Sequence, residues 1–492
     1  MFKKLVFDSE RIKKNKAHVI ICAVYCLVHL YVIFHHEHWM DEAQAWVIAK
    51  NLSVVEMFKI LCTEGHPCLW FLFLMPFAKL GLSFYYFSFI SLTIMTIAAY
   101  VFLNFASFSL IVKTGVLFSS VFLFYNPVVC RSYSLIALLI ILTATLYKCR
   151  LKHVYFYGFL ISLLFQSHVL VFGLAIGLTI DLFIDFLKDK RNKSILISIG
   201  MILISFITMV LQIMPRSDSP SGIDTSAGGI ISRFNLDNLL SNMQYYAYTA
   251  WGWMNKETFY IPYVALVICV ILIFVFITIN KSWKKNYQMI LIAICGLGVF
   301  FGVVLLVYKP HTQMASIMVM ILLFVLWQLY ADNDDLKLRT AILAMLTITS
   351  FLTFAISQSF LRDDIKKEYS TTLATAEVLI RDVPENGIIM LENSVFDPAV
   401  YSYVSSARED IVFYDARKKT EFKYYQMGSN YEELSVRTII DDVISQYSDV
   451  SIFYLTNSEK DDERIDLVYT SKDNDSVWKE HYYVYKIRSE EK

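Results

Sequence analysis

The chain has 492 residues, of which 56% are hydrophobic and 15% aromatic, and this composition excludes an ordinary soluble protein. The formal net charge is zero, and no basic patch predicts nucleic-acid binding. The charge is unevenly divided, because residues 1–358 carry 27 Lys and Arg against 17 Asp and Glu, while residues 359–492 carry 17 against 27. We therefore predict an α-helical polytopic membrane protein, with a membrane domain over residues 1–358 and a small α/β domain over residues 359–492.

A basic N-terminal segment precedes the first apolar run, which covers residues 17–34. No small-residue cleavage site comes before the histidines that follow, so this run is predicted to remain as a helix with its basic end in the cytoplasm. Further apolar runs near bilayer-spanning length follow it. They predict spans at residues 69–80, 84–105, 115–127, 133–147, 154–165, 168–187, 194–214, 259–279, 287–307, 311–330 and 339–357.

Clusters of Lys and Arg set the expected topology. Such clusters at residues 147–153, 187–193 and 280–286 predict cytoplasmic turns. In this topology the C-terminal domain is extracytoplasmic. The segments expected on the outer face of the cell membrane are residues 165–168, the loop 215–258, the "YKPHTQ" segment and the tail after Ser357.

The stretch between residues 35 and 147 has four apolar segments, although the charge rule requires an odd number of crossings. One short segment, either 69–80 or 115–127, is therefore expected to cross only half of the membrane or to fuse with its neighbour. The total expected is about 11 to 13 transmembrane helices.

The charged C-terminal segment alternates between strand-like and helical patterns. Helices are predicted at residues 372–383 and 436–447, and this alternation indicates a small α/β domain. No Gly-rich phosphate loop is present, so nucleotide binding is not predicted there. The predicted strands are "GIIMLEN", "DIVFYDA", "VSIFYLT", "IDLVYT" and "HYYVYKI".

The cysteines predict little chemistry. All eight lie before residue 296, and no CxxC pair or His and Cys array has zinc-ligand spacing. Neither a structural metal nor a disulfide framework is therefore predicted. Only Cys62 and Cys68, which share one loop, are candidates for pairing.

The first predicted external loop, residues 35–68, contains "HHEHWMDEAQAWVIAKNLS". One face of a helix there would carry Trp39, Ala43, Trp46, Val47 and Lys50, which predicts an amphipathic helix lying in the membrane interface. Asp41 and Glu42 stand in its first turn, where the helix dipole favours carboxylates. Two interpretations stay open: a capped interfacial helix, or an acidic pair in which one carboxylate acts as a general base.

Other polar residues stand at the outer helix ends. Glu64, His66 and Pro67 mark the mouth of the next helix, where Pro67 also suits a helix start. Arg131, with Tyr133 two residues on, is set in apolar sequence; an arginine at membrane depth costs about 2.5–3.5 kcal/mol unless it faces a polar cavity or snorkels to the interface. The remaining candidates are His168, Lys309 and His311, each of which also suits a simple interfacial position.

Three motifs, in this order, resemble a family of integral membrane glycosyltransferases. They are "MDEAQAW", "GHPCLWFLFL" and "NPVVCRSYSLIALL". Their order and spacing are similar to those of the protein O-mannosyltransferase and aminoarabinose-transferase type, which has the GT-C fold. The resemblance covers residues 17–190 by motif and continues to residue 357 by helix layout. Two departures are visible: Cys68 replaces a second proline, and "KPHTQ" replaces an Arg-Tyr pair.

This resemblance implies transfer of a sugar from a polyprenyl-phosphate carrier to an acceptor protein, glycolipid or wall polymer on the outer face, with inversion. Asp41 would be the general base, Glu42 would orient it or the acceptor, and Glu64 would help shape the pocket. No cofactor is required, although a divalent metal held by Asp41 and Glu42 stays open. The phosphate would be bound by Arg131, Lys309, His66 and His311, in that order, with Tyr133 and His168 completing the set.

Two other classes compete with this interpretation. A transporter or flippase for a lipid or amphipathic solute would use the same polar residues to line a path, and a noncatalytic envelope-assembly protein would use the C-terminal domain for binding. Transporters typically place charged residues near the bilayer midplane in repeated halves. No internal repeat is apparent, and the polar groups gather at the outer helix ends, which favours chemistry at the membrane surface.

Overall fold

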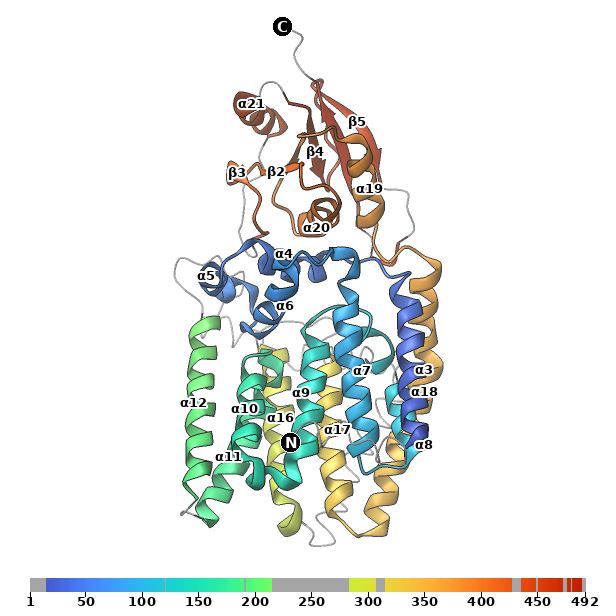
Figure 1. Ribbon diagram of the computed structural model, residues 1–492, viewed down its shortest axis with the longest axis vertical. Helices are drawn as coiled ribbons and strands as arrows, with labels where there is room; N and C mark the ends of the chain where they lie inside the picture. The colour runs from blue at the N-terminus through green and yellow to red at the C-terminus, as the bar shows by residue number, and fades with distance from the viewer. Residues whose placement is uncertain are drawn as a thin grey trace.

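The computed structural model describes residues 15–119, 121–189, 192–214, 283–306, 315–426, 435–447, 450–471, 476–478 and 480–488. Figure 1 shows a region of roughly parallel helices with a small sheet domain stacked on one end. Six helical stretches in this part of the chain are long and apolar enough to cross a membrane, as the polytopic class requires. They are Lys16–Ile33, Phe84–Phe105, Ser132–Phe165, Val169–Lys188, Lys193–Ile213 and Lys285–Val303.

The first helix, α3 (Lys16–Ile33), leads to the end of the helical region that carries α4 (Met40–Asn51), at the top of this region in Figure 1. This end is called the α4 end below. Two short helices follow there, α5 (Val54–Glu64) and α6 (Leu69–Lys79). With 11 residues, α6 is too short to cross a bilayer, so the predicted span 69–80 is the partial one.

Three passages then connect the two ends. After η1 (Phe84–Tyr86), the chain leaves the α4 end in α7 (Ser88–Phe105) and comes back in an interrupted stretch, α8 (Leu110–Leu117) and the π-helix η2 (Val121–Tyr125). It leaves again in α9 (Ser132–Leu146). The hydroxyl of Tyr25 in α3 donates a hydrogen bond to the carbonyl oxygen of Phe122 at 2.6 Å and so holds the interrupted stretch. The predicted span 115–127 is therefore interrupted, and three passages connect the two ends of the helical region between α6 and η3.

The remaining helices continue this alternation. At the end opposite α4, Arg150 forms an ion pair with Asp185 at 2.7 Å, so the basic clusters 147–153 and 187–193 lie at the same end, as predicted. The predicted loop 215–258, span 259–279 and "YKPHTQ" segment lie outside the described residues. The elements are η3 (Tyr147–His153), α10 (Val154–Phe165), η4 (Val169–Val171), α11 (Phe172–Lys188), α12 (Lys193–Ile213), α16 (Trp283–Leu306), α17 (Ala315–Asp332) and α18 (Leu336–Lys366).

The C-terminal domain is a six-stranded sheet in the order β3-β2-β1-β4-β6-β5, in which β2, β1 and β4 are parallel. Alternate residues of β1 point to opposite faces: Ile389 and Leu391 pack with α19 and α20, while Ile388 and Met390 pack with α21. All five predicted strands and both predicted helices are present. The elements are α19 (Thr372–Asp382), β1 (Ile388–Leu391), α20 (Asp397–Ala407), β2 (Val412–Asp415), β3 (Thr420–Glu421), α21 (Val436–Gln446), β4 (Ile452–Thr456), β5 (Ile465–Thr470) and β6 (Tyr483–Ile487).

Helix α18 joins the two parts without a break. It spans Leu336–Lys366, so the predicted domain boundary at residue 358 falls inside it. The sheet domain also covers α4, because α20 packs against α4 from above while α6 packs from below (Figure 1). This enclosure corrects the prediction of an amphipathic helix in the membrane interface. Trp39 and Trp46 are both 1% exposed, and the indole of Trp39 stacks on Trp478 of the sheet domain with ring centroids 4.1 Å apart.

The disulfide candidate is also corrected. Cys62 in α5 and Cys68 before α6 are both free thiols. The helix α5 ends at Gly65, which has φ of 68°, a left-handed conformation that glycine adopts without strain. The loop therefore turns by backbone geometry, and it places His66 directly after the turn.

Candidate functional site

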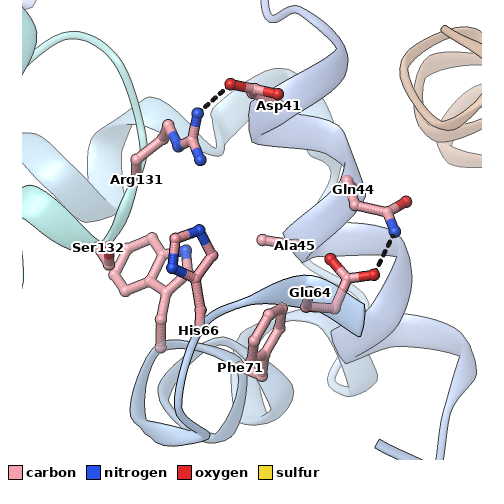
Figure 2. Close-up of a pocket in the computed structure, with 9 residues that line it drawn as sticks. Asp41, Gln44, Ala45, Glu64, His66, Phe71, Arg131 and Ser132 are labelled. Carbon is pink, nitrogen blue, oxygen red and sulfur yellow. Dashed lines mark hydrogen bonds and ion pairs between the residues drawn. The ribbon is translucent and has the colours of Figure 1, made fainter. Parts of the chain in front are cut away.

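A pocket opens at the α4 end, between α4, the turn after α5, and the start of α9 (Figure 2). It encloses about 490 Å³, open solvent at its mouth included. The helix α4, the turn after α5 and the start of α9 meet here because each of them lies at the same end of the helical region. The lining residues are Asp41, Gln44, Ala45, Glu64, His66, Trp70, Phe71, Arg131 and Ser132.

An ion pair between Asp41 and Arg131 forms one wall of the pocket. Asp41 stands in the first turn of α4, where the helix dipole stabilises a carboxylate, and Arg131 is the residue just before α9. Their side chains are 15% and 14% exposed. Arg131 therefore faces a polar cavity and a carboxylate, rather than snorkelling toward lipid headgroups.

Glu64 and Gln44 form the opposite wall in Figure 2. The amide of Gln44 donates one hydrogen bond to Glu64 Oε1 at 2.9 Å and another to the carbonyl oxygen of Tyr425 at 2.7 Å. Gln44 thus connects the pocket to the sheet domain. Burial raises the pKa of Glu64 to about 8, against the hydrogen bond from Gln44 and with a smaller contribution from the carboxylate of Asp41, so this side chain carries its proton at neutral pH.

A group of buried hydrogen-bonding side chains adjoins Arg131. The rings of His66 and His168 are 4.7 Å apart, those of His168 and Tyr133 are 5.8 Å apart, and the guanidinium of Arg131 lies 5.7 Å from the Tyr133 ring. Among the described residues, His66 Nδ1, His168 Nε2, the Tyr133 hydroxyl and Trp70 Nε1 have no hydrogen-bond partner. Buried polar atoms in native proteins are nearly always satisfied, so these four groups are available to bound water or to a ligand.

The protonation of His168 follows from its contacts. Its Nδ1 accepts a hydrogen bond from the backbone N–H of Leu170 at 3.1 Å. Burial lowers the pKa of His168 well below its ordinary value, so the ring is neutral and its single proton sits on Nε2. Burial, reinforced by Arg131, likewise lowers the pKa of His66 to about 4. Both rings therefore act as neutral hydrogen-bonding groups.

Glu42 belongs to a different cluster and does not line the pocket. Its carboxylate lies 3.2 Å from His36 Nε2 and 3.4 Å from His38 Nδ1, and it accepts a hydrogen bond from the backbone N–H of Cys130 at 2.7 Å. His36 Nδ1 in turn lies 3.1 Å from Asp364 of α18. The carboxylates of Asp364 and Glu42 outweigh the effect of burial and raise the pKa of His36 to about 10, while His36 and His38 hold the pKa of Glu42 well below its usual range despite its burial.

The predicted site residues therefore separate into groups. Asp41, Glu64, His66 and Arg131 line one pocket, with Tyr133 and His168 directly behind it, whereas Glu42 lies in the cluster with His36. Asp41 is paired with Arg131, and the group of potential metal ligands among the described residues contains Glu42 but not Asp41. Lys309 and His311 lie outside the described residues. Several pocket residues were not predicted from the sequence: Gln44, Ala45, Trp70, Phe71 and Ser132. Trp70 and Phe71 lie shortly after the predicted His66-Pro67 motif, and Gln44 lies one helical turn after Asp41, so their positions in the sequence were a usable signal.

A pH-dependent stability is expected from Glu64. Because its pKa is about 8 in the folded chain against an ordinary 4.5, the folded state keeps a proton that the unfolded state releases. The stability of the wild type should therefore fall as the pH rises from about 5 to about 8, and then level off. Glu64→Gln, which keeps the acceptor for Gln44 but cannot ionise, should lose less over this range. The check is thermal unfolding of both proteins across that pH range; parallel curves would contradict the protonated state of Glu64.

Comparison with known proteins places the chain in no family. No protein-family model matches it, and no curated protein sequence is similar to it.

Proposed function

We propose that the protein is a membrane glycosyltransferase of the GT-C type, which moves a sugar from a polyprenyl-phosphate carrier to an acceptor at the outer surface of the membrane. The observation that carries this proposal is the arrangement of one carboxylate, Asp41, against Arg131 and a group of unpartnered buried donors, at one end of apolar helices. Such an arrangement offers a base and an anion site within one pocket.

Asp41 serves as the general base. An acceptor hydroxyl is a weak nucleophile, and a carboxylate that takes its proton as the new bond forms accelerates the reaction by about 10²- to 10⁴-fold. The bond between the sugar and the phosphate oxygen breaks as the acceptor oxygen attacks the anomeric carbon from the opposite face. The proton goes to Asp41, and the electron pair leaves with the phosphate.

The leaving phosphate is stabilised by Arg131 and the donors beside it. Negative charge grows on the phosphate as the glycosidic bond breaks, and donors already oriented toward that charge lower the barrier without reorganising. His168 supplies an N–H at Nε2, Tyr133 a hydroxyl, and Trp70 an indole N–H, all buried. Neutral histidines suit this task, because they add hydrogen bonds without adding charges that would repel Arg131.

The ion pair with Arg131 couples the two halves of the site. In the substrate-free chain the guanidinium is bound to Asp41. A phosphate dianion or monoanion in the pocket competes for the same guanidinium, because both are oxygen anions. Binding of the donor phosphate then weakens the ion pair between Arg131 and Asp41, so the Asp41 carboxylate becomes available to the acceptor.

The other wall suits a sugar. Phe71 provides an apolar face, while Gln44 and the protonated Glu64 provide hydrogen bonds to hydroxyl groups. The lipid chain of the carrier would lie along the apolar helices, so the pocket needs to hold only the sugar and the phosphate. No cofactor is part of this scheme.

The position of the polar groups favours this function over transport. The pocket lies at the α4 end, beneath the sheet domain, where a membrane surface would meet the helices (Figure 1). A transporter would typically place its binding site near the middle of the bilayer, between repeated halves. In this proposal the sheet domain is extracytoplasmic and the basic clusters of residues 147–153 and 187–193 are cytoplasmic.

The decisive assay supplies membranes containing the protein with radiolabelled polyprenyl-phosphate hexoses and pentoses and measures label in the acceptor fraction. Arg131→Met, which keeps the length of the side chain but removes the cation, is expected to lower kcat/KM by about 10²- to 10³-fold. The donor KM should rise as well, because the phosphate loses its cation.

Arg362→Met is the matched control, since Arg362 at the end of α18 is 62% exposed and lies outside the pocket. It should transfer sugar at the wild-type rate. Equal transfer by the wild type and a folded Arg131→Met would exclude the phosphate site. Solute uptake by proteoliposomes without any sugar transfer would support the transporter instead.

A further inference from the structure

A second cluster of chemically active side chains lies outside the pocket. His36 and His38, in the segment between α3 and α4, meet Glu42 in the first turn of α4. One ligand atom from each of the three side chains, two imidazole nitrogens and a carboxylate oxygen, lie within 4.8 Å of one another. The residues are 7%, 2% and 0% exposed, so the cluster is closed to bulk water.

Each histidine lies about as far from an oxygen of Glu42 as two ligands of one small metal ion lie from each other. His36 Nε2 lies 3.2 Å from one oxygen of Glu42, and His38 Nδ1 lies 3.4 Å from the other. Two ligand atoms bound to one tetrahedral zinc ion at about 2.0–2.1 Å lie about 3.3 Å apart. Two imidazoles and a carboxylate are also a donor set that zinc accepts.

The surroundings orient these side chains as ligands. His36 Nδ1 is held by the carboxylate of Asp364 at 3.1 and 3.3 Å, which leaves Nε2 to face Glu42. A metal-binding histidine almost always has its second nitrogen fixed by a carboxylate or carbonyl in this way. On the other side, Ser88 Oγ lies 3.3 Å from His38 Nδ1, so a hydroxyl oxygen is close to one of the ligand atoms.

The charges in the cluster also favour a cation. Glu42 and Asp364 bring two carboxylates into a buried place, with exposures of 0% and 1%. Buried charges are tolerated only when they are paired or coordinate a metal, and a divalent ion would pair with both carboxylates.

We propose that His36, His38 and Glu42 bind one divalent transition-metal ion, zinc in the first instance. The role of the ion is structural, because none of the three side chains lines the pocket. The ion fastens the segment before α4 to α4 itself and, through Asp364, to α18. It thereby fixes the helix turn that presents Asp41. This proposal does not depend on the sugar-transfer function.

The test starts from the full-length protein, purified in detergent through an affinity tag that does not bind metal. Elemental analysis by mass spectrometry should find about one zinc per chain. A strong chelator should remove it and lower the thermal unfolding temperature, and added Zn²⁺ should restore that temperature. Co²⁺ added to the stripped protein should give the visible absorption of a tetrahedral nitrogen and oxygen site.

Variants separate the cluster from its neighbours. His38→Gln should abolish stoichiometric zinc, and Asp364→Asn should weaken zinc binding by about 10- to 100-fold in a chelator competition, because it removes the residue that orients His36. His35→Gln is the matched control, since His35 is an exposed histidine in the same segment and should leave zinc binding unchanged.

Two results would overturn the proposal. The first is a folded wild-type protein that holds no stoichiometric metal and whose unfolding temperature and spectrum do not respond to Zn²⁺ or Co²⁺. The second is equal zinc content in the wild type and a folded His38→Gln. Because the metal readouts are made on the wild type as well, a variant that fails to fold leaves the test intact, and loss of sugar transfer plays no part in it.

Discussion

Asp41→Asn is expected to lower the rate of sugar transfer by about 10²- to 10⁴-fold, the range over which general-base catalysis acts. Asparagine has nearly the same shape as aspartate and still accepts a hydrogen bond from Arg131, but it cannot take a proton from the acceptor. The loss should therefore appear in kcat, with a smaller effect on the KM for the donor. Arg131, relieved of its carboxylate, should bind the donor phosphate at least as well as before.

This split between kcat and KM distinguishes the base from the phosphate site, because Arg131→Met should raise the donor KM. The matched control is Asp334→Asn, an exposed aspartate at the opposite end of the helices. It should transfer sugar normally. A folded Asp41→Asn with the wild-type rate would remove Asp41 from the mechanism, whatever the pocket binds.

Glu42→Gln should instead act on stability, lowering the free energy of unfolding by about 3–5 kcal/mol, as expected when one partner of a buried ion pair is removed. The carboxylate is fully buried and contacts His36, His38 and the backbone N–H of Cys130. Glutamine cannot balance the charge of His36, nor hold a metal ion in the same way. The change is measured by denaturant or thermal unfolding in detergent.

An exposed glutamate provides the comparison. Glu377→Gln on α19 should change the unfolding free energy by less than about 0.5 kcal/mol. If Glu42→Gln were as stable as Glu377→Gln, the cluster around His36 would not hold the α4 end together. Loss of transfer in Glu42→Gln without loss of stability would return Glu42 to the catalytic set.

The different roles of these adjacent carboxylates follow from helix geometry. Successive residues of an α-helix point about 100° apart, because each turn has 3.6 residues. Asp41 and Glu42 are both in the first turn of α4, and their side chains diverge: Asp41 lines the pocket, whereas Glu42 contacts His36 and His38. Gln44, three residues after Asp41, shares the pocket face instead. The prediction of an acidic pair placed two neighbours in one site, and the period of the helix separates them.

Much of the architecture was visible in local patterns. The apolar runs correspond to helices, and the alternating C-terminal segments correspond to β1, β2, β4, β5 and β6. Helix α20 was missed because its sequence, "DPAVYSYVSSA", has few charges and resembles a loop, although Asp397 and Pro398 form a usual helix start. Strand β3 has only two residues, too few to produce a pattern.

The site was partly predictable for a related reason. Asp41 lies at the start of α4, His66 follows α5 and Arg131 precedes α9, and the course of the helices brings these three positions to the same end, so their polar side chains meet. Contacts between segments that are distant in the sequence cannot be predicted from local patterns. The stack of Trp39 on Trp478 and the contact of His36 with Asp364 join residues more than 300 positions apart. Tryptophans that looked like interface anchors are therefore part of a protein core.

The continuous course of α18 makes the two parts of this chain poor candidates for exchange as modules. A cut at residue 358 would sever the single helix α18, and each fragment would keep only one side of the interface between α4 and α20. A membrane part alone would expose Trp39 and the upper side of α4, and a sheet domain alone would expose the side of α20 that rests on α4. A recombinant chimera would retain a working pocket only if it inherited α4, the end of α18 and α20 as one unit, so we expect these three segments to change together in evolution.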